Sequence, residues 1–392
     1  MRCATIVLIA AALLSLFGPR ASAASPVNPP STHAKAAALI DVTSGRILYS
    51  NRGDEPMLIA STTKILTAII AIEQGDLDSM VTVSSRAAGK EGSSIYLKAG
   101  EKMKLKDMLY GLMLRSGNDA ATAIAEHVGG SLDGFVFLMN AKSEEIGMTH
   151  SHFANPSGLD QKGHYASAND MARLAAYALH NATFREIVST KVKTAPNPGE
   201  EWDYRWVNKN KILNMYEGAD GVKTGYTKQA LRTLVSSATR NGRQLAAVTL
   251  NDGDDWNDHA KLLDYGFSAY PLQTVAGKGE PVKGYPFITA EAFKYPFAAG
   301  ERDKLEIRLT MYGPETVDYK LGYRGSLAFW LDNKRIGAVE LLPQTPASVP
   351  SSSQPAVFRH VGLATSETVG HDEGKNTLKG SWLTVVRALF AV

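Results

Sequence analysis

The sequence predicts an α+β fold, in which a cluster of helices packs on an antiparallel sheet and a smaller β-rich domain follows. Apolar residues recur at helical spacing in several segments between residues 60 and 180, whereas residues 220–250 contain strand-like runs. Residues 274–342 hold further strand-like runs, separated by Gly and Pro and with little helical periodicity. A length of 392 residues, with 44% hydrophobic and 21% charged residues, suits two globular domains.

The N-terminus has the three parts of a secretory signal peptide, which we place at residues 1–23. Arg2 precedes an apolar run over residues 6–14, and Ala21-Ser22-Ala23 forms a small-residue cleavage site. The run is too short to span a membrane, so we expect export across the cytoplasmic membrane. Cleavage removes Cys3, the single cysteine, and lowers the formal net charge from +3 to +1. The mature chain therefore has no disulfide and no basic footprint for nucleic acid.

The first domain is expected over residues 24–272. It begins with a β-hairpin, because two short apolar segments, 36–41 and 46–50, flank the turn residues Val42-Thr43-Ser44-Gly45. Helical spacing follows in segments that are separated by polar turns or capped by Ser, as at Ser167. The predicted helices cover residues 61–72, 105–114, 120–125, 135–148, 171–179 and 261–270.

Three strands are predicted before the last of these helices, over residues 220–226, 233–238 and 245–250. Asn241-Gly242 separates the second strand from the third, and this dipeptide favours a tight hairpin turn. With the first hairpin, these strands form an antiparallel sheet assembled from both ends of the domain.

Three further parts are expected after residue 272. Residues 273–342 form the small β-rich domain, and residues 343–373 are rich in Pro and Ser and form a linker. Residues 374–392 place apolar side chains on one helical stripe, which predicts an amphipathic helix lying on a membrane surface. A helix docked on the protein's own core is the alternative. The stripe consists of Leu378, Trp382, Val385, Leu389 and Val392.

Ser61 and Lys64 are the first candidates for chemistry. At a spacing of three residues on a helix, their hydroxyl and amine lie on one face. A lysine in an apolar setting disfavours its charged form, so it can accept the serine proton near neutral pH. The helix N-terminus further favours an alkoxide. An ordinary helix start, with a capping serine and a solvated lysine, remains the alternative for so short a motif.

Two more motifs follow in the chain. Ser116-Gly117-Asn118 lies in the tight turn between two helices, where Ser116 can pass a proton and Asn118 can hold Lys64 or a substrate amide. Lys223-Thr224-Gly225 lies on a strand, where the cation and the hydroxyl suit a substrate carboxylate and Gly225 permits close approach of a peptide backbone. The N–H groups of Ser61 and Tyr226 are candidates for an oxyanion hole.

These motifs, together with Asn155-Pro156-Ser157-Gly158-Leu159-Asp160, resemble those of the serine D-alanyl-D-alanine carboxypeptidases, the low-molecular-mass penicillin-binding proteins. The resemblance covers residues 33–272 most clearly. It implies a β-lactamase/transpeptidase-like domain that removes the terminal D-Ala from peptidoglycan stem peptides through an acyl-serine, with β-lactams as acylating inhibitors. It implies catalytic roles for Ser61, Lys64, Ser116 and Asn118, and substrate binding by Lys223, Thr224, Gly225 and Tyr226.

The resemblance also implies a periplasmic protein, or one on the outer face of the cytoplasmic membrane, with no cofactor and no metal. Two departures stand out: Tyr226 replaces a histidine found in many members, and residues 251–258 are acidic where some relatives carry an arginine. A D,D-endopeptidase that cleaves crosslinks and a non-catalytic peptidoglycan-binding protein remain alternatives. A β-lactamase fits less well, because the deacylating glutamate of the class A enzymes is not identified in this sequence.

Two other patterns in the sequence have both a functional and a structural interpretation. His150 and His152 could bind a metal, but neither an H-E-x-x-H motif nor a carboxylate in register accompanies them. Trp202, Tyr204 and Trp206 alternate, which suits either a peptidoglycan-binding groove or a half-buried strand.

Overall fold

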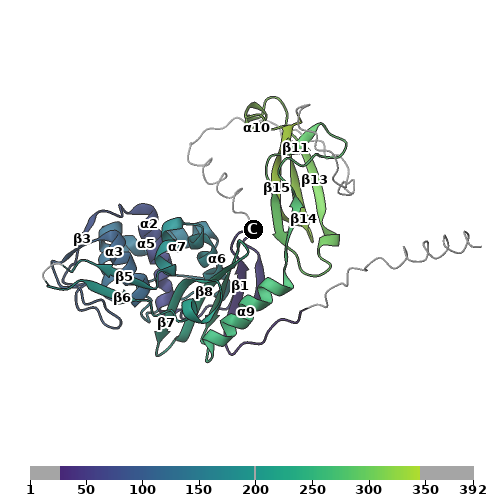
Figure 1. Ribbon diagram of the computed structural model, residues 1–392. Helices are drawn as coiled ribbons and strands as arrows, with labels where there is room; N and C mark the ends of the chain where they lie inside the picture. The colour runs from purple at the N-terminus through teal and green to yellow at the C-terminus, as the bar shows by residue number, and fades with distance from the viewer. Residues whose placement is uncertain (1–26, 198–199, 345–392) are drawn as a thin grey trace, which may run out of the picture.

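The computed structural model describes residues 27–197 and 200–344 (Figure 1). The expected signal peptide and the expected amphipathic helix lie outside the described residues, as does the linker after residue 344. Within the described part of the chain, no helix combines the length and the apolar character needed to cross a bilayer.

The centre of the first domain is a five-stranded antiparallel sheet of order β2-β1-β9-β8-β7. The N-terminal hairpin pairs through β1 with β9, so the two ends of the domain share one sheet, as predicted. The turn between β8 and β9 is Asn241-Gly242, with positive φ at both residues (51° and 75°). The strands are β1 (Ala36–Asp41), β2 (Ile47–Asn51), β7 (Ala219–Thr227), β8 (Leu231–Arg240) and β9 (Arg243–Leu250).

Helices cover both faces of this sheet. Ala36, Ala38 and Ile40 of β1 face the large helical cluster, whereas Ala37 and Leu39 face α9. Because β1 is buried on both sides, its sequence reads as a continuous apolar run rather than an alternating one. Figure 1 shows the helical cluster on one side of the sheet and α9 on the other.

The helical cluster surrounds α2, which is buried over its first two turns from Lys64 to Ala71. Ser167 caps α6 by accepting the N–H of Asp170, as predicted. The elements are η1 (Ala60–Thr63), α2 (Lys64–Gln74), α3 (Leu105–Tyr110), η2 (Gly111–Arg115), α4 (Asn118–Gly129), α5 (Leu132–Ile146), α6 (Ala168–Leu179), α7 (Ala182–Ser189), α8 (Ile212–Met215) and α9 (Asp255–Ala269).

The structure adds elements that the sequence patterns did not predict. Helices α7 and α8 are new, and α9 begins at Asp255, six residues before the predicted start, with acidic residues in its first turn that favour a helix N-terminus. Two short ribbons are also new. They pair β3 (Met80–Thr82) with β4 (Lys102–Lys104), and β5 (Val192–Ala195) with β6 (Tyr204–Val207).

The chain then enters a β-rich unit with its own core, in agreement with the predicted fold class. A four-stranded sheet of order β11-β15-β14-β13 lies beside the pair β10-β12, and Phe293 stacks on Phe329 with ring centroids 4.6 Å apart. The elements are β10 (Leu272–Ala276), β11 (Phe287–Thr289), β12 (Phe293–Pro296), η3 (Arg302–Lys304), β13 (Glu306–Met311), α10 (Val317–Lys320), β14 (Gly325–Leu331) and β15 (Lys334–Pro343).

Arg46, in the turn between β1 and β2, joins the β-rich unit to the central sheet. Its guanidinium donates to both carboxylate oxygens of Glu301, at 2.8 and 2.6 Å, and to the carbonyl of Pro296. It also lies 5.0 Å from the ring centroid of Tyr270 and 5.2 Å from that of Tyr295. A bidentate, half-buried pair of this kind adds orientation as well as attraction.

A buried ion pair between Asp41 and Arg243 links β1 to β9, and Asp41→Ala tests it. The Arg243 Nε donates to Asp41 at 2.7 Å, and both side chains are buried. The variant should lower the free energy of unfolding by about 3–5 kcal/mol, because the guanidinium would stay buried without its carboxylate.

Asp78→Ala is the matched control, since this side chain is 83% exposed and its carboxylate lies 3.0 Å from the amine of Lys104. Its effect should stay below about 1 kcal/mol. Urea denaturation at neutral pH measures both variants, and equal stabilities would contradict the expected cost.

Candidate active site

Ser61 lies on the 3-10 turn η1, immediately before α2, and Lys64 is the first residue of that helix. The expectation that Ser61 itself starts the long helix is therefore wrong by one turn, although the predicted meeting of the two side chains holds. Lys64 Nζ lies 3.0 Å from Ser61 Oγ. The turn is enclosed by the sheet and the helical cluster, so this pair sits where both layers meet.

The amine of Lys64 is fully buried and, among the described residues, has no carboxylate partner. It donates to Asn118 Oδ1 at 2.7 Å and to the carbonyl of Ser157 at 2.6 Å. Burial lowers the pKa of Lys64 well below its ordinary value, and the positive charge of Lys223 lowers it further. The neutral amine is thus favoured at this position.

The geometry then leaves one direction for the lone pair of Lys64. A neutral amine has two hydrogens, and the oxygens of Asn118 and Ser157 can only accept them. The third neighbour is Ser61 Oγ, whose hydroxyl can donate to the free lone pair. The arrangement can therefore remove the proton of Ser61 and make its oxygen a nucleophile.

Asn118 is held in the orientation that this geometry needs. Its Nδ2 donates to the carbonyl of Glu91 at 2.7 Å, which turns Oδ1 towards Lys64. Ser116 is 5% exposed and has a left-handed backbone, with φ of 67°, at the turn before α4. Among the described residues, its hydroxyl is not a partner of Lys64. The structure thus brings Asn118 into contact with Lys64. Ser116 lies two residues before Asn118, in the turn that precedes α4.

The third motif lies on β7, the edge strand of the sheet, beside η1. Lys223 is 2% exposed, and burial followed by the charge of Lys209 lowers its pKa to about 7. Gly225 faces the nucleophile turn so closely that an added Cβ would lie 3.0 Å from the backbone nitrogen of Ser61. Thr224 is partly exposed, and the Tyr226 side chain is 63% exposed. An edge strand offers unpaired backbone groups to a peptide.

Two further contacts complete the site. The carbonyl of Ser157, in the loop of residues 155–160, accepts a hydrogen bond from Lys64. Thr63, between Ser61 and Lys64, forms a hydrogen bond with the buried His164, 2.8 Å away. The only sequence signal for these contacts was the position of Ser157 and Thr63 within motifs, because His164 lies about a hundred residues from Thr63.

An open cleft of about 450 Å³ adjoins this site. Met57 and Leu58, which precede η1, line one side of it, and residues 160–165 line the other. Asp160 at its edge accepts the Thr227 hydroxyl at 2.8 Å. The cleft therefore lies between the segment before η1 and the loop of residues 160–165, and Gln229, just after β7, also lines it.

The aromatic and histidine patterns have structural roles. Trp206 is 4% exposed and stacks on Tyr204 with centroids 5.2 Å apart, which confirms the half-buried strand and leaves only Trp202 of the three exposed. His152 Nδ1 lies 2.6 Å from the carbonyl of Gly163, and the backbone N–H of His150 donates to Asp170. Neither histidine belongs to a metal-like cluster within the described residues.

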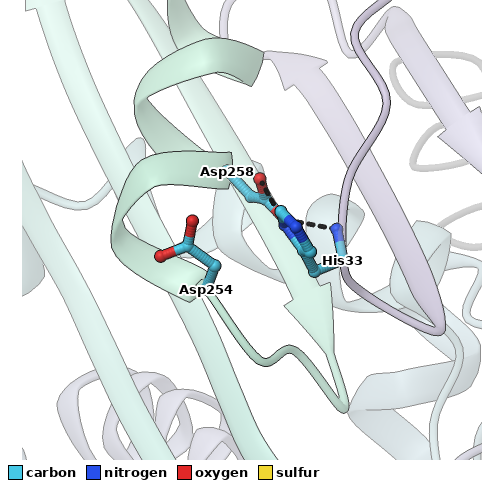
Figure 2. A group of neighbouring side chains, drawn as sticks. All are labelled: His33, Asp254 and Asp258. Carbon is cyan, nitrogen blue, oxygen red and sulfur yellow. Dashed lines mark hydrogen bonds and ion pairs between the residues drawn. The ribbon is translucent and has the colours of Figure 1, made fainter.

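One other cluster has the ligand types of a metal site: His33, Asp254 and Asp258, whose ligand atoms lie within 4.8 Å of one another (Figure 2). Asp258 already accepts from the backbone and ring of His33 and from Lys261 at 2.9 Å. The Asp258 carboxylate is thus already paired with a lysine ammonium. We interpret the cluster as a clamp between the segment before β1 and the start of α9.

Comparison with known proteins agrees with the geometry. Residues 23–254 match the Peptidase_S11 family, described as D-alanyl-D-alanine carboxypeptidase. The chain is 36% identical to D-alanyl-D-alanine carboxypeptidase DacF of Bacillus subtilis over 257 residues, covering 64% of this chain and 66% of that protein. It is 34% identical to DacC of Escherichia coli over 359 residues, covering 83% and 87%.

Solved structures are similar as well. The D-alanyl-D-alanine carboxypeptidase DacD from Francisella tularensis superposes with a TM-score of 0.64 at 25% identity, covering 84% of this chain and 97% of that one. A point mutant of the Streptomyces K15 DD-transpeptidase gives a TM-score of 0.58 at 32% identity, covering 61% and 99%.

Lys223 should make the stability of the fold depend on pH. Its pKa is about 7 in the folded protein and about 10.4 in an unfolded chain. Between these values the unfolded state binds more protons, so the free energy of unfolding rises with pH, by up to about 1.4 kcal/mol per pH unit for one group. Below about pH 7 both states hold the proton and this contribution is flat.

Lys223→Met should therefore remove the part of this rise in the free energy of unfolding that comes from Lys223. Lys304→Met, at a side chain that is 62% exposed, should leave the dependence of the free energy of unfolding on pH unchanged. Urea denaturation at a series of pH values between about 7 and 10 measures both. If the free energy of unfolding of the Lys223 variant rose with pH as steeply as that of the unsubstituted protein, the native amine would be charged over this whole pH range.

Proposed function

Since the chain belongs to the D-alanyl-D-alanine carboxypeptidase family and is a serine hydrolase of this type, we propose that Ser61 is the nucleophile and Lys64 its general base. The observation that carries this proposal is that every hydrogen-bond contact of the Lys64 amine within the described residues is with a neutral group. Two acceptor oxygens take its hydrogens, and its third contact is Ser61 Oγ at 3.0 Å.

The substrate is a peptidoglycan stem peptide that ends in D-Ala-D-Ala. Its terminal carboxylate binds the hydroxyl of Thr224 in the positive field of Lys223, and its backbone lies along the edge of β7. The close packing of Gly225 on the Ser61 nitrogen supports this placement, because the strand and the nucleophile then flank the same narrow space. The N–H groups of Ser61 and Tyr226 receive the carbonyl oxygen of the penultimate D-Ala.

The reaction proceeds in two steps. Ser61 Oγ attacks the carbonyl carbon and its proton passes to Lys64, which forms a tetrahedral intermediate. The C–N bond then breaks, Ser116 relays the proton to the leaving amine, and D-Ala departs from an acyl-serine ester. Water hydrolyses the ester by the reverse proton path and releases the shortened peptide. A β-lactam amide acylates Ser61 in the same way.

An extracytoplasmic location agrees with a peptidoglycan substrate. The finer proposal is that residues 1–23 direct export and that residues 374–392 hold the enzyme on the outer face of the cytoplasmic membrane. The apolar stripe from Leu378 to Val392 and the Pro-rich segment before it support this arrangement.

Ser61→Ala should abolish both labelling by a fluorescent penicillin and release of D-Ala from pentapeptides, because Ser61 is the only described side-chain hydroxyl that contacts Lys64. Ser268→Ala, at an exposed serine on α9, is the matched control and should keep full activity. Mass spectrometry of peptidoglycan with pentapeptide monomers and crosslinked dimers identifies the products. Loss of dimers without release of free D-Ala would indicate an endopeptidase. No change in either the monomers or the dimers would indicate a non-catalytic binding protein.

Deletion of residues 374–392 should release the protein from membranes without changing its rate of penicillin labelling. The tail supplies the apolar area for binding a lipid surface, while every proposed catalytic residue lies before residue 227. Fractionation of cells that express the full and the shortened chain measures this. Unchanged membrane association of the shortened chain would refute the anchoring role.

A further inference from the structure

His164 lies directly behind the nucleophile turn and has no part in the proposed proton path. The side chain is 2% exposed and meets the Phe153 ring edge to face, with centroids 5.7 Å apart. Its Nε2 lies 2.8 Å from Thr63 Oγ1, and its Nδ1 lies 3.1 Å from the backbone nitrogen of Ala154. Both ring nitrogens are therefore engaged inside the protein.

The backbone contact determines the tautomer of His164. The N–H of Ala154 can only donate, so Nδ1 must accept and the ring proton must be on Nε2. Nε2–H then donates to Thr63 Oγ1. Burial lowers the pKa of His164 to about 4, so the ring stays neutral near pH 7.

The donated bond orients the Thr63 hydroxyl. Its lone pair is used by His164, so its hydrogen is directed to the carbonyl of Ala60, 2.8 Å away. Ala154, His164, Thr63 and Ala60 thus form one directed chain of hydrogen bonds, and every donor in it has a single acceptor. The chain ends on the peptide group that precedes Ser61.

Ala60 needs such support. Its φ is +47°, a left-handed conformation that a residue with a Cβ adopts at a cost of about 1–2 kcal/mol. Gly158 packs on the same carbonyl so closely that any Cβ there would overlap the Ala60 oxygen. The conformation of Ala60 sets the direction of the Ser61 N–H and side chain, because the two residues share a peptide bond.

We propose that His164 is a positioning residue for acylation: by holding Thr63 on the Ala60 carbonyl, it maintains the left-handed turn that aims Ser61 Oγ and the Ser61 N–H at the substrate carbonyl. This inference rests on the proposed function of Ser61. It predicts that loss of the bond slows formation of the acyl-enzyme but leaves the initial binding of substrate unchanged. Substrate recognition lies on β7, which His164 does not contact through a hydrogen bond within the described residues.

Three substitutions separate this role from simple core packing. His164→Phe keeps an aromatic ring and removes the donor. Thr63→Val keeps the shape and removes the hydroxyl, while Thr63→Ser keeps the hydroxyl and serves as the conservative rescue. His180→Asn is the matched control, because the ring of this histidine bonds to the backbone carbonyl of Ala176 at the end of α6 and, within the described residues, forms no hydrogen bond with the nucleophile turn.

The measurement is the kinetics of labelling by a fluorescent penicillin, with the active fraction titrated for each variant so that rates refer to folded sites. His164→Phe and Thr63→Val should each lower the limiting acylation rate constant by at least about 10-fold, the scale expected when a reacting atom is misplaced. The apparent binding constant should not change. The acylation rate constants of Thr63→Ser and His180→Asn should stay within about 2-fold of the unsubstituted value. The double variant, His164→Phe with Thr63→Val, should acylate no more slowly than the slower of the two single variants.

The proposal is overturned if both single variants acylate within about 2-fold of the unsubstituted rate, or if their effects multiply in the double variant. It is also overturned if only the active fraction falls, since that is the result for a packing role. Because Thr63→Val is nearly isosteric, it keeps the test valid if His164→Phe folds poorly. Labelling of the unsubstituted chain, and its absence in Ser61→Ala, shows independently whether the underlying function holds.

Discussion

A buried amine without a counter-charge is the constraint on which the rest of the active site depends. Placing the Lys64 ammonium in the interior would cost several kcal/mol, so the fold accommodates the neutral amine instead. It does so with two acceptors that carry no charge, Asn118 Oδ1 and the Ser157 carbonyl. The carboxylate of Asp119 forms no ion pair with the amine within the described residues and instead accepts the backbone N–H groups of Ile95 and Leu97. The site thus keeps a basic nitrogen beside a hydroxyl, at the expense of the stability that an ion pair or an apolar side chain would supply.

The architecture explains how such a site is assembled from distant segments. The nucleophile turn leads into α2 at the centre of the helical cluster, Asn118 begins α4, and β7 is the sheet edge that faces the turn. The strand β1 is buried between two helical layers and pairs with β9, which ties the start of the domain to its end. This rigid framework can hold a strained turn at Ala60. The loop at Gly158 and the hydrogen-bonded pair of Thr63 and His164 restrict the backbone of Ala60, and none of these residues takes part in the proposed reaction. The pattern is the usual one for catalytic groups, whose precision depends on supporting contacts.

Some features were predictable because they are local. The hairpin at Asn241-Gly242 follows from the φ preferences of two residues, and the cap at Ser167 follows from one hydroxyl and one N–H. The early start of α9 was missed because Asp255 and Asp258 suggest a polar loop until their position in a first helical turn is known. The aromatic stripe was ambiguous because periodicity shows that one face of a strand is apolar, but not whether Trp206 covers a core or a ligand. His164 gave no signal at all, since an isolated histidine has no pattern.

By itself, the sequence determined the strands of the central sheet, the one-turn spacing of Ser61 and Lys64, and the chemical types available for catalysis. These properties depend on neighbours within a few residues, and the covalent chain sets them. Only the tertiary structure decided that Lys64 is buried beside two neutral acceptors, that Gly225 lies against the Ser61 nitrogen, and that His164 supports the turn from about a hundred residues away. Burial and long-range hydrogen bonds decide pKa and orientation, and both arise only when distant segments pack together.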